Sequence, residues 1–283
     1  MLTVLESLQL STEYLEKKRI ESARLNAELL LAEILNCKRL DLYLKFDQPL
    51  KENEVDKYRE LISRRGKFEP LQYITGKAEF FGLTFKVNSS VLIPRPETEL
   101  MVEAIIERFK SADGCRILDI GTGSGNISVT LAKFLENCSV TTIDTSEEII
   151  SLAKENAAQI GSSENINFIK ADMNNYSTDG VPFDLIVSNP PYVSMADYSE
   201  TQREIREFEP ATAVTDFGDG LTFYKLISSR LNYILKTGGS IYLEVGMGQA
   251  AGVASILQER GVQKINFIKD YQQIDRIVYG ELK

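Results

Sequence analysis

The sequence predicts an α/β protein in which a small helical bundle and a β-hairpin precede a doubly wound, mainly parallel seven-stranded sheet. Apolar residues recur at helical spacing up to about residue 75 and alternate with polar residues between about 77 and 90. From residue 116 onward, short apolar runs alternate with helical segments, which is typical of a parallel sheet with helices on both faces. A chain of 283 residues, 43% of them hydrophobic, can bury such a core.

Residues 1–75 predict a helical domain. Their apolar positions recur every three or four residues, as on the buried face of an amphipathic helix, in a bundle that ends near Gly66. Such stripes indicate a core, and we give them no catalytic role. They comprise Leu5, Leu8, Leu15, Leu25, Leu29, Ile34, Leu35, Val55, Tyr58, Leu61 and Ile62.

Residues 76–95 predict a β-hairpin that connects the helical domain to the rest of the chain. Phe81, Leu83, Phe85 and Val87 alternate with smaller or polar residues, which is the period of a half-buried strand. Pro96 follows, and proline is favoured at the first position of a helix because its φ angle is already fixed there. We therefore expect a helix from Glu97 to Lys110.

Residues 96–283 predict the parallel sheet. The expected strands begin at Arg116 and continue at Ser139 to Ile143, Asn165 to Ile169, Phe183 to Ser188, Ser240 to Val245, Lys264 to Ile268 and Ile274 to Tyr279, the last two in a closing hairpin. Ligands of such sheets bind outside the carboxyl ends of the strands. Gly121 and Asn189 both follow strands directly, so we expect them at that edge.

Asn189-Pro190-Pro191-Tyr192 follows one of these strands and is suited to bind a planar nitrogen. Prolines donate no backbone hydrogen bond and stiffen the turn, so its carbonyl groups and the Asn189 side-chain oxygen can accept hydrogens from an incoming NH2 group. Tyr192 adds an aromatic face for a flat amide or base. The alternative is a simple turn at the end of a strand, where Asn and Pro are common.

Asp119-Ile120-Gly121-Thr122-Gly123-Ser124-Gly125 predicts a loop that binds a nucleoside cofactor. Its glycines allow a tight turn and a close backbone approach, and the helix that follows points free N–H groups at the same place. The spacing differs from the dinucleotide fingerprint, which requires glycine where this chain has Asn126. Asp119 would repel a pyrophosphate but would favour the cationic S-adenosylmethionine.

Acidic residues after the next two strands fit the same cofactor. Asp144 ends its strand, where a carboxylate can accept hydrogen bonds from ribose hydroxyls. The alternative is a helix N-cap, which Ser146 could provide instead. Asp172 and Met173 follow the third strand and could contact the adenine amino group and ring, although a polar turn explains them nearly as well.

Composition limits the function classes. A net charge of −9 argues against a protein that binds long nucleic acids, because phosphates are neutralised by Lys and Arg. The sequence has no histidine, and Cys37, Cys115 and Cys138 are too scattered for a zinc site, so we expect no metal. No apolar run approaches the roughly 18 residues that a membrane span requires, and no signal peptide is evident, so we expect a cytoplasmic protein without a membrane partner.

These motifs, in this order and with strand-sized gaps, resemble those of class I S-adenosylmethionine-dependent methyltransferases with a Rossmann-like fold. The Asn-Pro-Pro-Tyr variant narrows the resemblance to enzymes that methylate planar nitrogens of adenine or glutamine. The segments from Pro70 to Gly76, Phe80 to Leu83 and Val91 to Glu99 closely resemble the protein-(glutamine-N5) methyltransferases of peptide chain release factors, the PrmC/HemK family. Phe208-Glu209-Pro210 and Asp275-Arg276 agree with this family, which the chain resembles from about residue 20 onward.

The resemblance implies a donor, an acceptor and a site. S-adenosylmethionine would donate the methyl group to the glutamine of a Gly-Gly-Gln loop in a class 1 release factor, and the helical domain would contact the rest of that partner. The expected cofactor-binding residues are Asp119, Gly121, Thr122, Gly123, Ser124, Gly125, Asp144, Asp172, Met173 and Asn189. The expected substrate-binding residues are Asn189, Pro190, Pro191 and Tyr192, of which Asn189, Pro190 and Tyr192 are expected to be catalytic.

Two other functions remain open at this point. An adenine-N6 methyltransferase of DNA or RNA would bind a flipped base with the same Asn-Pro-Pro-Tyr turn. The acidic composition and the Pro94 to Glu99 segment argue against it. A binding module that lacks chemistry would need to have lost the glycine loop or the turn, and both are intact.

Overall fold

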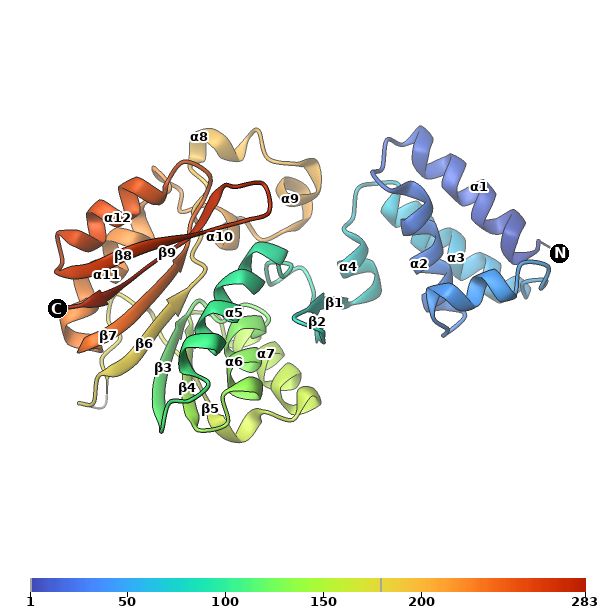
Figure 1. Ribbon diagram of the computed structural model, residues 1–283. Helices are drawn as coiled ribbons and strands as arrows, with labels where there is room; N and C mark the ends of the chain where they lie inside the picture. Colours follow the sequence, from blue (N-terminus) through green and yellow to red (C-terminus); the bar gives the residue numbers. More distant parts are fainter. Residues whose placement is uncertain (1, 179) are drawn as a thin grey trace. The chain divides into compact units, whose positions relative to one another are not determined.

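The computed structural model describes residues 2–178 and 180–283, which divide into two compact units (Figure 1). The first unit comprises the residues up to Lys77 together with Gln202–Phe208. The second comprises Ala78–Thr201 and Glu209–Lys283. None of the helices in the described ranges is both long and apolar enough to cross a membrane.

The first unit is a helical bundle. Its elements are α1 (Val4–Lys17), α2 (Ala23–Ile34), η1 (Arg39–Leu44), α3 (Glu52–Arg65), α4 (Leu71–Thr75) and α9 (Arg203–Phe208). On α2, Ala27, Leu30 and Leu31 are fully buried, whereas Leu25 is 41% exposed. The placement of Leu25 in the core stripe was therefore wrong, because positions i, i+3 and i+4 from Ala27 form the buried face and Leu25 lies outside it.

The second unit contains a seven-stranded sheet with the order β5-β4-β3-β6-β7-β9-β8. Its strands are β3 (Cys115–Ile120), β4 (Cys138–Asp144), β5 (Ile166–Lys170), β6 (Phe183–Ser188), β7 (Leu235–Glu244), β8 (Val262–Lys269) and β9 (Asp275–Leu282). Strands β3 to β7 pair in parallel, and β9 pairs antiparallel with β7 and β8. The predicted fold class is confirmed.

Helices cover both faces of this sheet (Figure 1). They are α5 (Pro96–Phe109), α6 (Asn126–Phe134), α7 (Glu147–Ile160), α11 (Thr222–Ile234) and α12 (Ala250–Gln258), with the short η2 (Ser163–Asn165), α8 (Met195–Tyr198) and α10 (Ala211–Val214) in connections. Successive strand residues point to opposite faces, so Ile117 and Leu185 join the core beside α5 and α6. Leu118 and Ile186 join the other core, beside α11 and α12.

The chain order places a topological switch point at β3. From β3 the chain proceeds outward through β4 to β5, and it then returns to the other side of β3 as β6. In doubly wound sheets the connections at such a point leave a crevice at the carboxyl ends of the strands. Gly121 follows β3 and Asn189 follows β6, as expected from the sequence.

The predicted hairpin consists of β1 (Lys77–Phe80) and β2 (Leu83–Lys86). Phe81 and Gly82 form the turn, with φ angles of 53° and 72°. Two successive positive φ angles suit a two-residue hairpin, because they match the twist of the paired strands. The extension of the strand through Phe81 was therefore wrong, although Phe85 and Val87 are buried as expected.

Candidate functional site

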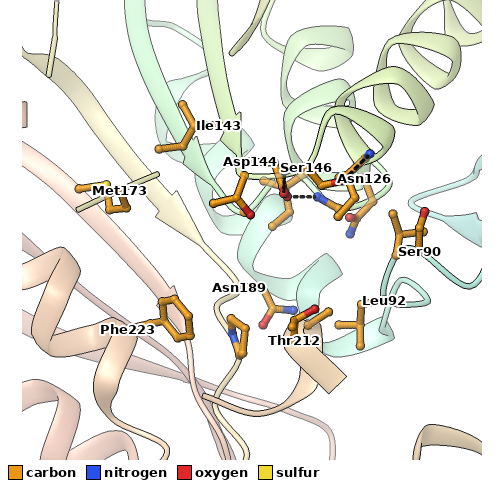
Figure 2. Close-up of a pocket in the computed structure, with 18 of the residues that line it drawn as sticks. Ser90, Leu92, Asn126, Ile143, Asp144, Ser146, Met173, Asn189, Thr212 and Phe223 are labelled. Carbon is orange, nitrogen blue, oxygen red and sulfur yellow. Dashed lines mark hydrogen bonds between the residues drawn. The ribbon is translucent and has the colours of Figure 1, made fainter. Parts of the chain in front are cut away.

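A cavity of about 500 Å³ lies at the carboxyl ends of the central strands of the second unit. Its lining comes from the ends of β3, β4, β5 and β6, from the Ser90 to Thr98 segment, and from α10 and α11. In Figure 2, Asp144, Ser146 and Asn126 lie above the cavity, and Asn189, Thr212 and Phe223 lie below it. The volume falls within the range of sites that bind small molecules.

The glycine loop forms one wall. Gly121 and Gly123 have φ angles of 89° and 53°, and both line the cavity. A Cβ atom on either glycine would meet no described atom within 4 Å, so the backbone at these positions borders open space. Gly125 instead packs inward, where a Cβ atom would lie 3.1 Å from the side chains of Ala153 and Val129.

Asp119 lies behind the loop and is fully buried. Its Oδ2 atom accepts a hydrogen bond from the Thr142 hydroxyl at 2.9 Å, and Thr142 Oγ1 lies 2.8 Å from Thr122 Oγ1. Burial raises the pKa of the Asp119 carboxyl to about 7. Asp119, Thr122, Ser124 and Gly125 do not line the cavity in the described structure, so this chain of hydrogen bonds supports the loop from behind.

Asp144 lines the cavity at the end of β4. Its carboxylate accepts hydrogen bonds from the backbone N–H of Ser146 at 3.1 Å and of Gly123 at 3.5 Å. Burial raises its pKa, and these N–H groups oppose that shift. Ser146 is the N-cap of α7, because its hydroxyl accepts a hydrogen bond from the Ile149 N–H. The N-cap alternative for Asp144 is thus excluded.

Asp172 and Met173 line the wall after β5. The Asp172 Oδ1 atom accepts hydrogen bonds from both the backbone N–H and the side-chain amide of Asn174, each at 2.8 Å. Asp172 therefore has two roles in the structure: it stabilises the polar turn through Asn174, and it also lines the cavity. Met173 is buried and gives the cavity an apolar surface.

The Asn-Pro-Pro-Tyr turn follows β6, and two of its four residues, Asn189 and Pro191, line the cavity. Pro190 is buried. Tyr192 does not line the cavity in the described structure: its hydroxyl donates a hydrogen bond to Glu244 Oε1 at 3.4 Å, and its backbone carbonyl accepts one from the Gln249 side chain at 2.8 Å. Burial raises the pKa of the Tyr192 hydroxyl. The stacking role predicted for Tyr192 stays a prediction.

The Asn189 side chain has a defined orientation. Its Nδ2 atom donates a hydrogen bond to Thr98 Oγ1 at 3.2 Å, and the Thr98 hydroxyl donates to Glu244 Oε2 at 2.5 Å. The amide NH2 group is therefore held by the protein. The amide oxygen is left as the polar atom of this side chain that can accept hydrogens from a ligand.

Several cavity residues carry little or no signal of their own in the sequence. Thr98 stands out only as part of the Val91 to Glu99 segment that resembles the family, and Phe223 and Leu226 belong to the apolar face of α11. Glu209, which supports the rim of the cavity, has as its sequence signal the Phe208-Glu209-Pro210 segment that agrees with the family. It is buried and accepts hydrogen bonds from the Ile93 N–H at 3.1 Å and from the Arg95 guanidinium at 2.5 Å. These bonds connect the Ser90 to Thr98 segment to the start of α10, and both segments contribute to the cavity lining.

Comparison with known proteins decides the family. A family model described as the PrmC N-terminal domain matches residues 6–76, and one described as a methyltransferase domain matches residues 111–217. A release factor glutamine methyltransferase of Geobacter sulfurreducens is 41% identical over 280 residues, covering 99% of this chain and 97% of the relative. The chain belongs to the release factor glutamine methyltransferase family.

Other relatives agree with this membership. The family member of Fusobacterium nucleatum is 40% identical over 272 residues, covering 96% of this chain and 77% of the relative. Among solved structures, the hMettl16 catalytic domain in complex with a MAT2A 3′UTR hairpin has a TM-score of 0.57 at 18% identity, covering 82% of this chain and 83% of that one. At this identity the likeness concerns the fold alone.

Membership confirms the predicted enzyme class and cofactor: the chain is an S-adenosylmethionine-dependent methyltransferase. The cavity fits this cofactor. Gly121 and Gly123 leave room beside the backbone, and the Asp144 carboxylate can accept hydrogen bonds from ribose hydroxyls. Ile143 and Met173 offer apolar surface for the adenine ring.

Proposed function

We propose that this enzyme methylates the side-chain amide nitrogen, N5, of the glutamine in the Gly-Gly-Gln loop of peptide chain release factors. The names of its relatives support this substrate. The observation that carries the proposal is the orientation of Asn189, whose NH2 group is bound to Thr98 and whose oxygen can therefore accept a hydrogen from an incoming amide.

The acceptor site must compensate for the weak nucleophilicity of an amide nitrogen, whose lone pair is delocalised into the carbonyl group. The Asn189 oxygen and the Pro190 carbonyl would each accept one hydrogen of the glutamine NH2 group. Two such hydrogen bonds fix the plane of the amide and increase the electron density on its nitrogen. Orientation of this kind can account for a large part of the rate enhancement when the reacting atoms are about 3 to 3.5 Å apart.

The donor site would consist of the glycine loop, Asp144, Asp172 and Met173, with Asp119 supporting the loop through Thr142. When bound, S-adenosylmethionine supplies an activated methyl group on a sulfonium sulfur. The apolar side chains of Met173, Pro191 and Phe223 reduce the water in the cavity, which strengthens the hydrogen bonds that orient the acceptor.

A methylated amide nitrogen must lose one proton to become neutral again. The sequence has no histidine, so imidazole is excluded as the acceptor of this proton. We expect water to take it, and no strong base is required because the proton is acidic once the nitrogen carries a fourth substituent.

The helical unit would contact the part of the release factor outside the Gly-Gly-Gln loop, in the cytoplasm. No stable complex with nucleic acid is expected, since the net charge is −9. Cross-linking of the full chain to a release factor, followed by mass spectrometry, tests this contact. Cross-links that avoid residues 1–75 would contradict it.

The function is tested by incubating the full-length enzyme with S-adenosylmethionine and purified release factor, and by locating the added mass with tandem mass spectrometry. We expect one methyl group on the glutamine of the Gly-Gly-Gln loop and none on a release factor in which that glutamine is replaced by alanine. A parallel incubation with total nucleic acid tests the adenine-N6 alternative. Methyl transfer to nucleic acid without transfer to the release factor would overturn the proposal.

A further inference from the structure

Three residues from separate elements form a buried chain of hydrogen bonds behind the acceptor site. Thr98, the third residue of α5, is fully buried. Its hydroxyl donates to Glu244 Oε2 at 2.5 Å and accepts from Asn189 Nδ2 at 3.2 Å. Glu244 is the last residue of β7 and is 1% exposed. Its other oxygen accepts a hydrogen bond from the Tyr192 hydroxyl at 3.4 Å, so the Glu244 carboxylate is linked to Tyr192 directly and to Asn189 through Thr98.

The positions of the hydrogens in the hydrogen bonds from Asn189 through Thr98 to Glu244 can be assigned. When Glu244 is ionised, its carboxylate has no proton to donate, whereas the threonine hydroxyl has one. The Thr98 proton must therefore point to Glu244, which leaves only lone pairs facing Asn189. Those lone pairs can bind the NH2 end of the Asn189 amide but not its oxygen end.

The two ends of an asparagine amide are nearly equal in size, so shape alone does not fix which end faces the cavity. If the amide turned over, its oxygen would face the Thr98 lone pairs without a proton between them. Leaving a buried polar group unpaired in this way is unfavourable, so the reversed amide is the disfavoured orientation. The reversed amide would also present its own NH2 group to the NH2 group of the substrate, where neither can accept.

We propose that Thr98 and Glu244 are positioning residues, which select the amide orientation of Asn189 in which its oxygen faces the acceptor nitrogen. This inference rests on the proposed function, in which that oxygen accepts a hydrogen from the substrate amide. Neither residue touches the reacting atoms. Thr98 acts through Asn189, and Glu244 acts through Thr98.

The test uses two substitutions at Thr98 in the full-length enzyme, assayed on a release factor at pH 8. Burial raises the pKa of the Glu244 carboxyl to about 7, so at pH 8 it is mostly ionised. Thr98→Val keeps the shape and removes the hydroxyl, and we expect kcat to fall at least about tenfold. Thr98→Ser keeps the hydroxyl and should recover kcat to within about threefold of wild type.

Three further readouts separate positioning from a general structural effect. The KM for the release factor and the Kd for S-adenosylmethionine, measured by calorimetry, should stay within about twofold in Thr98→Val, because the Thr98 hydroxyl is bonded to Glu244 and Asn189 and is not expected to bind either ligand. In an Asn189→Ala background, Thr98→Val should have no further effect on kcat, since its action passes through Asn189. Thr130→Val is the matched control. It removes a hydroxyl that is fully buried on α6 and has no hydrogen-bond partner among the described residues, and it should leave kcat unchanged.

The possible outcomes distinguish the two proposals. If the wild-type enzyme does not methylate the release factor glutamine, the proposed function fails. If it does, but Thr98→Val retains its kcat, raises only KM, or lowers kcat equally in the Asn189→Ala background, the positioning role is overturned. If Thr98→Val does not fold, Glu244→Gln replaces it in the test. The glutamine NH2 group can donate to the Thr98 hydroxyl, so the Thr98 proton is no longer forced away from Asn189 and the preference for one Asn189 amide orientation is lost. We expect the same loss of kcat there, and a wild-type kcat in that variant would overturn the inference.

Discussion

The side chain of Asn156 on α7 donates a hydrogen bond to the carbonyl oxygen of Ser124 at 2.8 Å, which stabilises the backbone of the glycine loop. The same amide also binds the end of the hairpin, since its oxygen accepts from the Lys86 N–H at 2.7 Å and its nitrogen donates to the Lys86 carbonyl at 3.0 Å. Asn156 is fully buried. One amide therefore satisfies backbone groups of two segments that are distant in the sequence.

Asn156→Ala should lower the free energy of unfolding by about 2–4 kcal/mol, because the buried Ser124 carbonyl and the partly buried Lys86 N–H and carbonyl lose their partner. It should also weaken S-adenosylmethionine binding, since the loop at Ser124 is no longer held. Denaturant unfolding and calorimetry measure the two effects. Asn137→Ala, at an exposed position, is the control and should change the unfolding free energy by less than about 0.5 kcal/mol. Equal stability of the two variants would contradict the prediction.

Gly123→Val should abolish measurable S-adenosylmethionine binding. A side chain at this position would extend into the open space that the loop borders, and the φ angle of 53° adds backbone strain. Gly161→Val is the matched control. Gly161 has a φ angle of 76° and equally open surroundings, but it caps the end of α7 and does not line the cavity. If both variants bind the cofactor with the same Kd, the loop does not form its site.

Asp144→Ala should raise the Kd for S-adenosylmethionine by about 10- to 150-fold, because charge-assisted hydrogen bonds to ribose contribute on the order of 1.5–3 kcal/mol. Glu148→Gln is the control: it removes an exposed carboxylate from the first turn of α7, the helix that follows Asp144, and should leave the Kd unchanged. Calorimetry with both variants tests the assignment. An unchanged Kd in Asp144→Ala would remove Asp144 from the cofactor site.

The sheet was predictable from the sequence because each strand carries its own local signal. Runs such as Phe183 to Ser188 are short and mainly apolar, with Asp184 and Ser188 as the exceptions, and the alternation with helices implies parallel pairing. The turn at Phe81 was not predictable in this way. Its positive φ angle follows from the pairing of β1 with β2, and phenylalanine rarely adopts such an angle without that tertiary constraint.

The cavity was only partly predictable. Gly121 and Asn189 follow strands directly and Asp144 ends one, so the carboxyl edge of the sheet brings them together. The hydrogen-bond chain from Asn189 through Thr98 to Glu244 joins three elements up to 146 residues apart, and nothing local to any of them specifies the contact. Phe223 could not be recognised either, because an aromatic residue on a helix is more often part of a core.

Asn189→Ala should reduce kcat by at least an order of magnitude, equivalent to about 1.4 kcal/mol of barrier, because one hydrogen of the acceptor amide loses its partner. The Kd for S-adenosylmethionine should change little, since the groups expected to hold the ribose and adenine remain. Steady-state methylation of a release factor and calorimetry provide the two measurements. Full activity in this variant would refute the role of Asn189, and loss of cofactor binding alone would reassign it to the donor site.

The buried carboxyl of Asp119 should make stability depend on pH. Burial raises its pKa in the folded protein to about 7, from an ordinary value of 3.8. A raised pKa means that the folded state holds the proton more tightly than the unfolded chain, so the stabilisation is complete below about pH 4 and is lost as the pH rises through about 7. The loss amounts to about 4 kcal/mol, at 1.36 kcal/mol for each pKa unit. Asp119→Asn removes this titrating group. The unfolding free energy of the variant minus that of wild type should therefore increase from pH 4 to pH 8, because only the wild-type protein loses the Asp119 contribution. Denaturant unfolding at the two pH values measures the difference, and a constant difference would show that Asp119 ionises in the folded protein as it does in the unfolded chain.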